Sequence, residues 1–342
     1  MSNTRDIQLF NDAEVQRVAP ADHRKDPTQR ALKEERALLK KQGYYIVGQH
    51  SGVKLCHWTK NKICGGQGCY KETFYGIDCH RCIQMTPTID RCNLQCQFCW
   101  RHMSWQDSFG HDCDEPKDIV LGAIEGQKKL LSGYGGNPKA DVKLYKEALK
   151  PNQTAISLTG EPTMYPYIGE LIKEYESRGI QTFLVTNGTL PNVIEKMERL
   201  PTQLYVTVAA PDEETYNRLC APMGKRGWKD LMKTLELLPS LSCRTVVRHT
   251  LVKNWNMHGA EEYARLDRIA RPDFIECKGY SFVGESRLRM TMDNMPSHEE
   301  IRVFSSEIAR RTGYDVAGER QDSRVQVLTE KPEKMRLAKR DD

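Results

Sequence analysis

Cys92-Asn-Leu-Gln-Cys96-Gln-Phe-Cys99 is a C-x3-C-x2-C run on a short segment, and it is the most informative stretch of the chain. Three thiolates at this spacing can each bind one iron of a [4Fe-4S] cluster, which takes four ligands in all. The fourth iron then stays open to a small molecule, to which the cluster can pass an electron. A zinc site using Cys96 and Cys99 is the alternative, but the run lacks the second cysteine pair of a zinc ribbon. The aromatic Phe98 and a strand expected just before the run also favour the cluster.

Short β-type segments alternate with amphipathic helical segments from residue 88 onward. This alternation predicts an α/β fold, in which helices cover a parallel sheet and right-handed crossovers join the strands. Six such units suit an open, partial (β/α)6 barrel better than a closed eight-fold one, with the working residues at the carboxyl ends of the strands. The expected strands are 88–91, 154–158, 181–186, 204–209, 244–252 and 274–280, with a late strand at 324–328. The expected helices are 117–131, 165–177, 191–200, 213–220, 228–238, 260–270 and 297–312.

A second set of cysteines lies upstream, where Cys56, Cys69 and Cys82 follow one another at intervals of 13 residues. Spacing this wide cannot form one tight ligand loop, so an ordered segment must bring the three together. They could hold another cluster with one open iron. Zinc bound by Cys79 and Cys82, with Cys64 and Cys69 as further ligands, explains the same pattern, as do scattered structural thiols. The spacing alone leaves these alternatives open.

The composition is that of a soluble globular chain, with 342 residues, 39% hydrophobic residues and a net charge of +5. No run approaches the roughly 18 apolar residues that a membrane-spanning helix needs, and the first residues lack the order of a secretory signal. We therefore expect a cytoplasmic protein that binds no membrane, whose crowded cysteines bind metal rather than form disulfides. The mild basic excess permits a nucleic-acid partner without demanding one. Residues 1–42 are charge-dense, and a helix over 30–42 is either a solvated face or a tRNA-binding arm.

Two tripeptides follow expected strands: Gly160-Glu161-Pro162 and Thr186-Asn187-Gly188. Each alone is compatible with an ordinary strand-ending turn. In this order, together with the cysteine run, they resemble the radical S-adenosylmethionine (SAM) superfamily. The resemblance implies that the backbone and carboxylate of the first tripeptide meet the methionine amino group of SAM, and that the SAM-binding residues are Gly160, Glu161, Thr186 and Asn187.

Five longer segments carry a more specific resemblance: CHWTKN (56–61), CYKETFYGIDCHRCIQMTP (69–87), CNLQCQFCWR (92–101), RHTLVKNWNM (248–257) and IECKGYSFVGESRLRMTMDNMPSHEEI (275–301). They resemble the tRNA 4-demethylwyosine synthase family, the radical SAM enzymes of wyosine biosynthesis, and the match runs from about residue 43 to about residue 329. It implies four parts along the chain. These are a charged helical extension (1–42), an auxiliary-cluster segment (43–86), the radical SAM barrel (87–289) and a C-terminal wyosine-base-formation extension (290–342).

The resemblance implies an enzyme, a carbon–carbon lyase or synthase, that condenses pyruvate with the N1-methylguanosine 3′ of the anticodon in tRNA-Phe. The product is the imidazopurine ring of 4-demethylwyosine, formed through a 5′-deoxyadenosyl radical. Lys71 becomes the proposed Schiff-base lysine, although without the match it would count as an ordinary surface lysine. The chain resembles the single-domain archaeal form, so we expect a monomer that takes electrons from a separate ferredoxin- or flavodoxin-type donor. The implied ligands are Cys92, Cys96 and Cys99 for the SAM cluster and Cys56, Cys69 and Cys82 for a second [4Fe-4S] cluster, with Cys64, Cys79 and Cys113 as bystanders.

Contacts with tRNA are expected from basic and aromatic residues near the strand ends, because a modified guanosine must leave its stack to meet the radical. The same residues could equally be surface charges and core aromatics. Two other functions remain open at this point: another radical SAM enzyme with an auxiliary cluster, or a zinc-ribbon RNA-binding protein using Cys64, Cys69, Cys79 and Cys82. The candidate tRNA contacts are Trp100, Arg101, Lys278, Arg287 and Arg289, with His102 and Tyr280 also available.

Overall fold

The computed structural model describes residues 36–101, 103 and 113–338. Contacts divide the chain into a short unit, Met1–Gln42, and a large unit, Gly43–Asp342. Residues 36–41 of the short unit are helical, within the helix expected over 30–42, whose first residues lie outside the described part. None of the helices in the described part is long and apolar enough to cross a membrane.

The large unit is built on one ten-stranded sheet in the order β1-β2-β3-β4-β5-β6-β7-β8-β10-β9. The strands from β3 to β8 pair in parallel, which gives the six-stranded open barrel that the sequence predicts. The antiparallel pair β1 and β2 extends one edge, and β10 and β9 extend the other. The strands are β1 (Tyr44–Val47), β2 (Ser51–Lys54), β3 (Cys82–Thr86), β4 (Gln153–Ile156), β5 (Gln181–Thr186), β6 (Gln203–Thr207), β7 (Arg244–Leu251), β8 (Phe274–Gly279), β9 (Asp315–Arg320) and β10 (Val325–Thr329).

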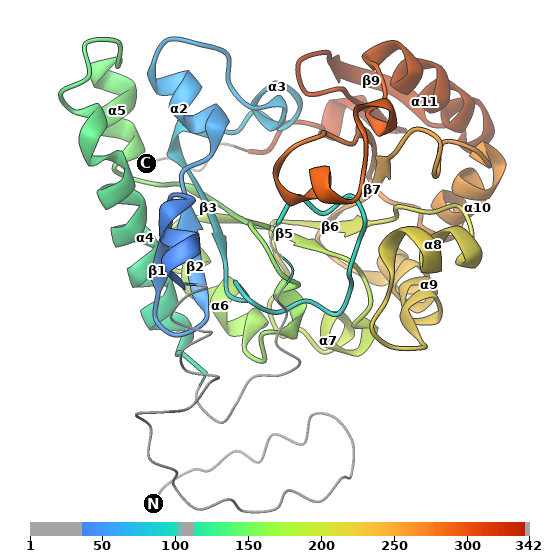
Figure 1. Cartoon of the computed structure of the whole chain (residues 1–342), viewed down its shortest axis with the longest axis horizontal. Coiled ribbons are helices and arrows are strands. Elements are labelled where there is room, and N and C mark those ends of the chain that lie inside the picture. The colour runs from blue at the N-terminus through green and yellow to red at the C-terminus, as the bar shows by residue number, and fades with distance from the viewer. Residues whose placement is uncertain (1–35, 102, 104–112, 339–342) are drawn as a thin grey trace, which may run out of the picture. The chain divides into compact units, whose positions relative to one another are not determined.

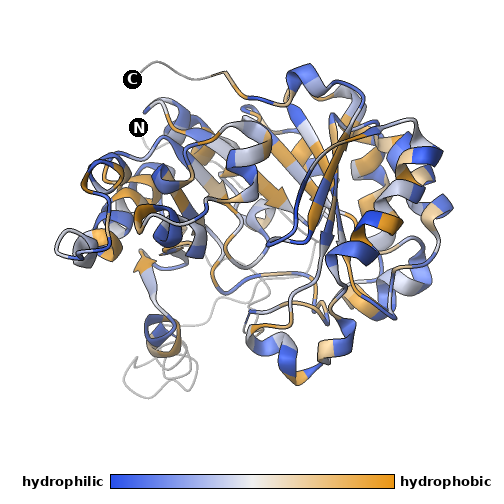
Figure 2. Ribbon diagram, turned by 90° about the horizontal axis from the view of Figure 1, so that it is seen from above, coloured by the Kyte–Doolittle hydropathy of each residue, from blue (hydrophilic) through white to orange (hydrophobic). Residues whose placement is uncertain are grey.

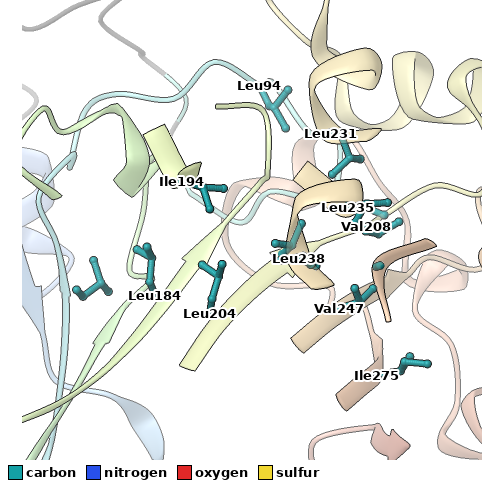
Figure 3. Packing of buried hydrophobic residues seen from close by; sticks show 14 of the residues in the cluster. Leu94, Leu184, Ile194, Leu204, Val208, Leu231, Leu235, Leu238, Val247 and Ile275 are labelled. Carbon is teal, nitrogen blue, oxygen red and sulfur yellow. The ribbon is translucent and has the colours of Figure 1, made fainter. Parts of the chain in front are cut away.

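Helices lie along the outside of this curved sheet (Figure 1). Between them and the sheet, apolar side chains such as Leu204, Val247 and Ile275 pack with Leu231 and Leu235 of α9 (Figure 3). The strands are therefore mostly apolar in Figure 2, as expected for parallel strands that are buried on both faces. The helices are α4 (Pro116–Leu131), α5 (Val142–Ala148), α6 (Ile168–Glu176), α7 (Pro191–Glu195), α8 (Glu213–Cys220), α9 (Gly227–Leu237), α10 (Ala260–Ala270) and α11 (His298–Thr312).

The opposite face of the sheet, here called the inner face, is covered by the short helix α3 (Tyr70–Tyr75). Its aromatic residues pack against Phe183, Tyr205 and Phe274, which point away from the outer helices because side chains alternate along a strand. The segment that precedes α3 contains α2 (His57–Ile63). The inner face therefore receives the part of the chain that carries the upstream cysteines.

The first parallel strand differs from the expectation. It is β3 (Cys82–Thr86), whereas residues 88–91 form a loop in which the amide of Ile89 donates to the carbonyl of His50 over 2.9 Å. Pro87 follows β3 directly and cannot donate to a ladder, which ends the strand. The strands β1 and β2 and the helices α2 and α3 also lie in a segment, 43–86, whose sequence shows little periodicity, and β9 and α5 were not expected either.

Candidate functional site

The C-x3-C-x2-C loop over 92–99 is held in place by the end of α8. The amide of Gln97 donates to the carbonyl of Leu219 over 2.9 Å. Arg289, expected as a tRNA contact, donates to the carbonyls of Gln97 and Cys99. The loop therefore has fixed backbone partners on two sides, which places its cysteines at the carboxyl ends of the strands.

The three thiols of this loop, called the first triplet (Cys92, Cys96 and Cys99), influence one another. Burial raises the pKa of Cys99 to about 11, and the neighbouring Cys96 acts in the same direction. Burial and then Cys96 also raise the pKa of Cys92. For Cys96 the main cause of a raised pKa is a hydrogen bond with Cys220, a neighbour that the sequence analysis did not single out. Metal binding at such a site displaces the thiol protons.

The upstream cysteines also come together, and we call them the second triplet (Cys56, Cys69 and Cys82). Cys56 precedes α2, Cys69 precedes α3, and Cys82 is the first residue of β3. Burial raises the pKa of Cys69 to about 11 and that of Cys82 to about 12, and in both cases the Cys56 thiol adds to the effect. The short helices α2 and α3 thus lie between successive cysteines and bring residues that are 13 positions apart close together.

The two bystander cysteines near the second triplet have structural contacts. The thiol of Cys79 is buried, accepts a hydrogen bond from the amide of Cys69 over 3.4 Å and donates to Glu72. Cys64 accepts from the side chain of Asn137 over 3.9 Å. Both side chains therefore have a packing role that needs no metal.

The described part of the chain contains no site for a single metal ion. A tetrahedral zinc with Zn–S bonds of about 2.3 Å needs sulfurs roughly 3.8 Å apart. Within residues 36–101, 103 and 113–338, no three His, Cys, Asp or Glu side chains converge in this way. A [4Fe-4S] cluster differs from a single ion in that each of its irons takes a different cysteine. Each triplet offers three cysteines, the number that leaves one iron of such a cluster without a protein ligand.

Lys71 lies on α3, two residues after Cys69, and is buried rather than on the surface, with 9% exposure. Its Nζ lies 4.4 Å from the ring centroid of Tyr205 and 5.0 Å from that of Phe183. Burial lowers the pKa of Lys71, and Arg248 lowers it further, against the opposing effect of Glu276. The amine of Lys71 thus lies over the rings of Tyr205 and Phe183, beside the second triplet.

A network of polar side chains surrounds these aromatic rings. Arg248 on β7 and Glu276 on β8 pair at 2.9 Å, and the hydroxyl of Tyr75 donates to the carboxylate of Glu276 over 2.7 Å. Lys278, expected as a tRNA contact, lies in the same interior: its Nζ donates to the carbonyl of Ser323 over 2.9 Å, and burial lowers its pKa to about 8. Arg248 and Glu276 were not among the predicted site residues, although charged residues inside buried strands are a visible signal in the sequence.

Gly160 makes the turn after β4 possible. Its φ is +70°, and a Cβ there would lie 1.8 Å from the carbonyl oxygen of Thr88 and 2.4 Å from that of Arg91. The next amide, of Glu161, donates to the same Arg91 carbonyl over 2.8 Å. The turn is therefore pressed against the segment that leads into the first triplet, and only glycine fits.

Glu161 joins the ends of β4 and β5. Its carboxylate accepts hydrogen bonds from the amide and hydroxyl of Thr163, from the hydroxyl of Thr186 over 2.6 Å and from the amide of Asn187 over 2.7 Å. The Asn187 side chain continues to Asn93, between the cysteines, over 2.8 Å. The structure thus brings the four residues expected to bind SAM together with the first triplet.

The remaining candidate tRNA contacts differ in exposure. Trp100 is 42% exposed and Arg287 is exposed, whereas Arg101 is only 6% exposed and stacks on Trp100 with its Cζ 3.1 Å from the ring centroid. Tyr280 is buried, and its hydroxyl pairs with Ser286. His102 lies outside the described residues. Trp100 and Arg287 are therefore the members of this set that an RNA can reach without opening the interior.

Comparison with known families identifies the class of protein. The profile for the radical SAM superfamily matches residues 86–266, and the profile for wyosine base formation matches residues 269–330. This chain, an open parallel barrel with a three-cysteine loop at its strand ends, is therefore a radical SAM enzyme. The class implies SAM and a [4Fe-4S] cluster.

Relatives specify the family. The S-adenosyl-L-methionine-dependent tRNA 4-demethylwyosine synthase of Pyrococcus abyssi (strain GE5 / Orsay) is 51% identical over 297 residues, which are 85% of this chain and 87% of the relative. A structure of TYW1 with a lysine–pyruvate adduct bound has 37% identity and a TM-score of 0.80, covering 89% of this chain and 97% of that chain. A crystal structure of archaeal TYW1 has 35% identity and a TM-score of 0.74, covering 89% and 99%. The chain belongs to the tRNA 4-demethylwyosine synthase family of wyosine biosynthesis.

Proposed function

We propose that this enzyme condenses pyruvate with the N1-methylguanosine 3′ of the anticodon in tRNA-Phe, using two [4Fe-4S] clusters held by the two cysteine triplets. The observation that carries the proposal is the position of Lys71, buried on the ring of Tyr205 and within the electrostatic reach of Cys69 and Cys82. When bound, SAM and the cluster on the first triplet supply a radical able to break an unactivated methyl C–H bond, which no side chain can do.

Lys71 is the residue that handles pyruvate. Burial and the nearby Arg248 lower its pKa, so a larger share of the side chain is the free amine at neutral pH. The free amine attacks the pyruvate carbonyl, and water leaves as the Schiff base forms. The lysine–pyruvate adduct in the structure of TYW1 supports this role, because that chain is 37% identical to this one.

The residues at the ends of β4 and β5 hold SAM against the first triplet. Glu161 fixes the turn at Gly160 and the backbone of Asn187, while Asn187 bonds to Asn93 inside the cysteine loop. Because the same hydrogen-bond network supports both the loop and the strand ends, the cofactor and its cluster share one rigid frame.

The methylguanosine reaches this frame by leaving its stack, and exposed Trp100 and Arg287 at the rim are the contacts we assign to it. Residues 43–86 serve as the auxiliary-cluster segment and 290–342 as the wyosine-base-formation extension of a barrel over 87–289. The auxiliary segment shares β3 with the barrel, since Cys82 begins that strand. A separate ferredoxin- or flavodoxin-type protein donates electrons to a cytoplasmic monomer.

Anaerobic reconstitution tests the proposal. We expect about eight irons per chain, whereas a single cluster gives about four. Borohydride added with pyruvate should trap the adduct on Lys71, which peptide mass spectrometry locates. A Lys71→Ala variant should still cleave SAM to 5′-deoxyadenosine but form no tricyclic base, while Lys143→Ala, at a side chain that is 84% exposed, should behave as the wild type. Product formation by Lys71→Ala at the wild-type rate would contradict the role of Lys71.

A further inference from the structure

Arg248 on the inner face is anchored along one edge of its guanidinium group. Its Nε and Nη2 lie 3.0 and 2.9 Å from one oxygen of Glu276, and Nη2 also donates to the hydroxyl of Tyr70 over 2.7 Å. Glu276 itself is fully buried and accepts a further hydrogen bond from Tyr75. These bonds fix both the position and the plane of the guanidinium.

The third nitrogen of Arg248, Nη1, remains available. Nη1 donates to no group in the described part of the chain, and it is not sealed from solvent. The Arg248 side chain keeps 14% of its surface exposed, while that of its partner Glu276 has none. A cation that is held on one edge and open on the other is suited to receive an anion.

This open donor lies beside the nucleophile. The Cζ of Arg248 is 4.5 Å from the ring centroid of Tyr205, and the Nζ of Lys71 is 4.4 Å from the same centroid, so the two groups are at most about 8.9 Å apart. A pyruvate joined to Nζ through its carbonyl carbon carries its carboxylate on the next carbon, and a hydrogen bond adds about 2.9 Å. The whole span, roughly 6 Å, lies within this upper limit.

We propose that Nη1 of Arg248 binds the carboxylate of the pyruvate that Lys71 holds, and that Glu276 and Tyr70 position Arg248 for this purpose. The inference rests on the proposed function, which it deepens by naming the group that selects an α-keto acid over a neutral ketone. A lysine at position 248 would keep the ion pair with Glu276 but lose the second, open edge of the guanidinium. A positive charge at this position is therefore not sufficient to bind the carboxylate while the ion pair with Glu276 is kept.

The test compares pyruvate with pyruvamide, which has the same carbonyl but no carboxylate, by trapping the Lys71 adduct with borohydride in the anaerobically reconstituted enzyme. We expect the wild type to require about 10- to 100-fold less pyruvate than pyruvamide for half-maximal trapping, the range of a charge-assisted hydrogen bond. Arg248→Lys should raise the pyruvate requirement by that factor and leave the pyruvamide requirement unchanged. Glu276→Gln should also weaken the preference for pyruvate over pyruvamide, because it loosens the edge of the Arg248 guanidinium that Glu276 anchors.

Arg244→Lys is the matched control. Arg244 lies four residues earlier on β7, on the same face, and its guanidinium is bonded to Gln203 and to the carbonyls of Lys334 and Met335. This variant should retain the preference for pyruvate.

Three outcomes are informative beyond the expected one. A wild type that traps both ketones equally, or an Arg248→Lys variant that keeps the preference, would overturn the role of Arg248 and leave the proposed function intact; the second result would assign the carboxylate to another group, such as the metal of the second triplet. Absence of any pyruvate adduct on Lys71 in the wild type would instead overturn the proposed function. Iron content and SAM cleavage, measured in each variant, show that both triplets are unaffected.

Discussion

Replacing Gly160 by alanine tests whether the turn after β4 depends on the missing side chain. The added Cβ would overlap two backbone carbonyl oxygens, 1.8 Å away at Thr88 and 2.4 Å away at Arg91, and neither can rotate aside. The left-handed backbone costs an alanine about 1–2 kcal/mol, and relieving the overlap costs about 1–3 kcal/mol more. We expect Gly160→Ala to lower the free energy of unfolding by about 2–5 kcal/mol. It should also displace the segment that leads into the first triplet and slow SAM cleavage.

Gly179 supplies a control that separates the two costs. Its φ is +71°, close to the +70° of Gly160, but no heavy atom lies within 4 Å of a Cβ built there. Gly179→Ala should therefore lose only the backbone part, about 1–2 kcal/mol, with SAM cleavage unchanged. The assay is urea unfolding of both anaerobically purified variants, together with the rate of 5′-deoxyadenosine formation. Equal losses of stability in the two variants would refute the reasoning, because the overlap would then cost nothing.

Three further predictions concern buried polar groups. Tyr75→Phe removes a hydroxyl that donates to Glu276 and should cost about 1–2 kcal/mol in urea unfolding. Tyr263→Phe removes a buried hydroxyl that has no hydrogen-bond partner among the residues that the structure describes, so it should cost nothing or stabilise. In the wild type the Glu161 carboxylate accepts from the hydroxyl of Thr186 and the amide of Asn187, and in Glu161→Gln an amide NH₂ would face one of these donors instead. Because this loses a hydrogen bond that holds the strand ends, equilibrium binding of SAM should weaken about 10-fold. Burial lowers the pKa of Lys278 to about 8, so between pH 8 and about 10 the unfolded chain binds more protons and stability rises with pH. Relative to Lys278→Met, the wild type should gain about 1 kcal/mol from pH 8 to pH 9, and parallel pH profiles of the two proteins would contradict this.

The sequence predicts the barrel well where strands are buried on both faces. The strands from β4 to β8 and the helices α8 and α10 lie where continuous apolar runs and helical periodicity place them. The strand β3 was expected six residues too late, because Cys82 and Gln84 interrupt its apolar pattern while residues 88–91 mimic a strand. The edge strands β1 and β2 have only four residues each, too few for a period-two pattern to stand out.

The candidate site shows the same division between local and distant information. The first triplet is a local motif, so its spacing reveals it, whereas the turn at Gly160 stands out only through its order after the cysteine run and the resemblance that this order supports. The network around Lys71 depends on register: Arg248 pairs with Glu276 because they are opposite one another on β7 and β8. Such pairs are separated by 28 residues in the chain, and only the completed sheet shows that their charges cancel. Burial is equally invisible to spacing, which is why Arg101 was expected at the RNA surface although it is 6% exposed.

The strand β3 has a consequence for how the two triplets communicate. Its first residue is Cys82, and its last, Thr86, leads into the loop of the first triplet. Five residues of extended chain measure roughly 16 Å and cannot stretch, and pairing with β2 and β4 holds them in register. An inserted or deleted residue would turn Cys82 to the other face of the sheet. The strand therefore acts as a rigid spacer, which sets the distance between the second triplet at its start and the loop of the first triplet beyond its end.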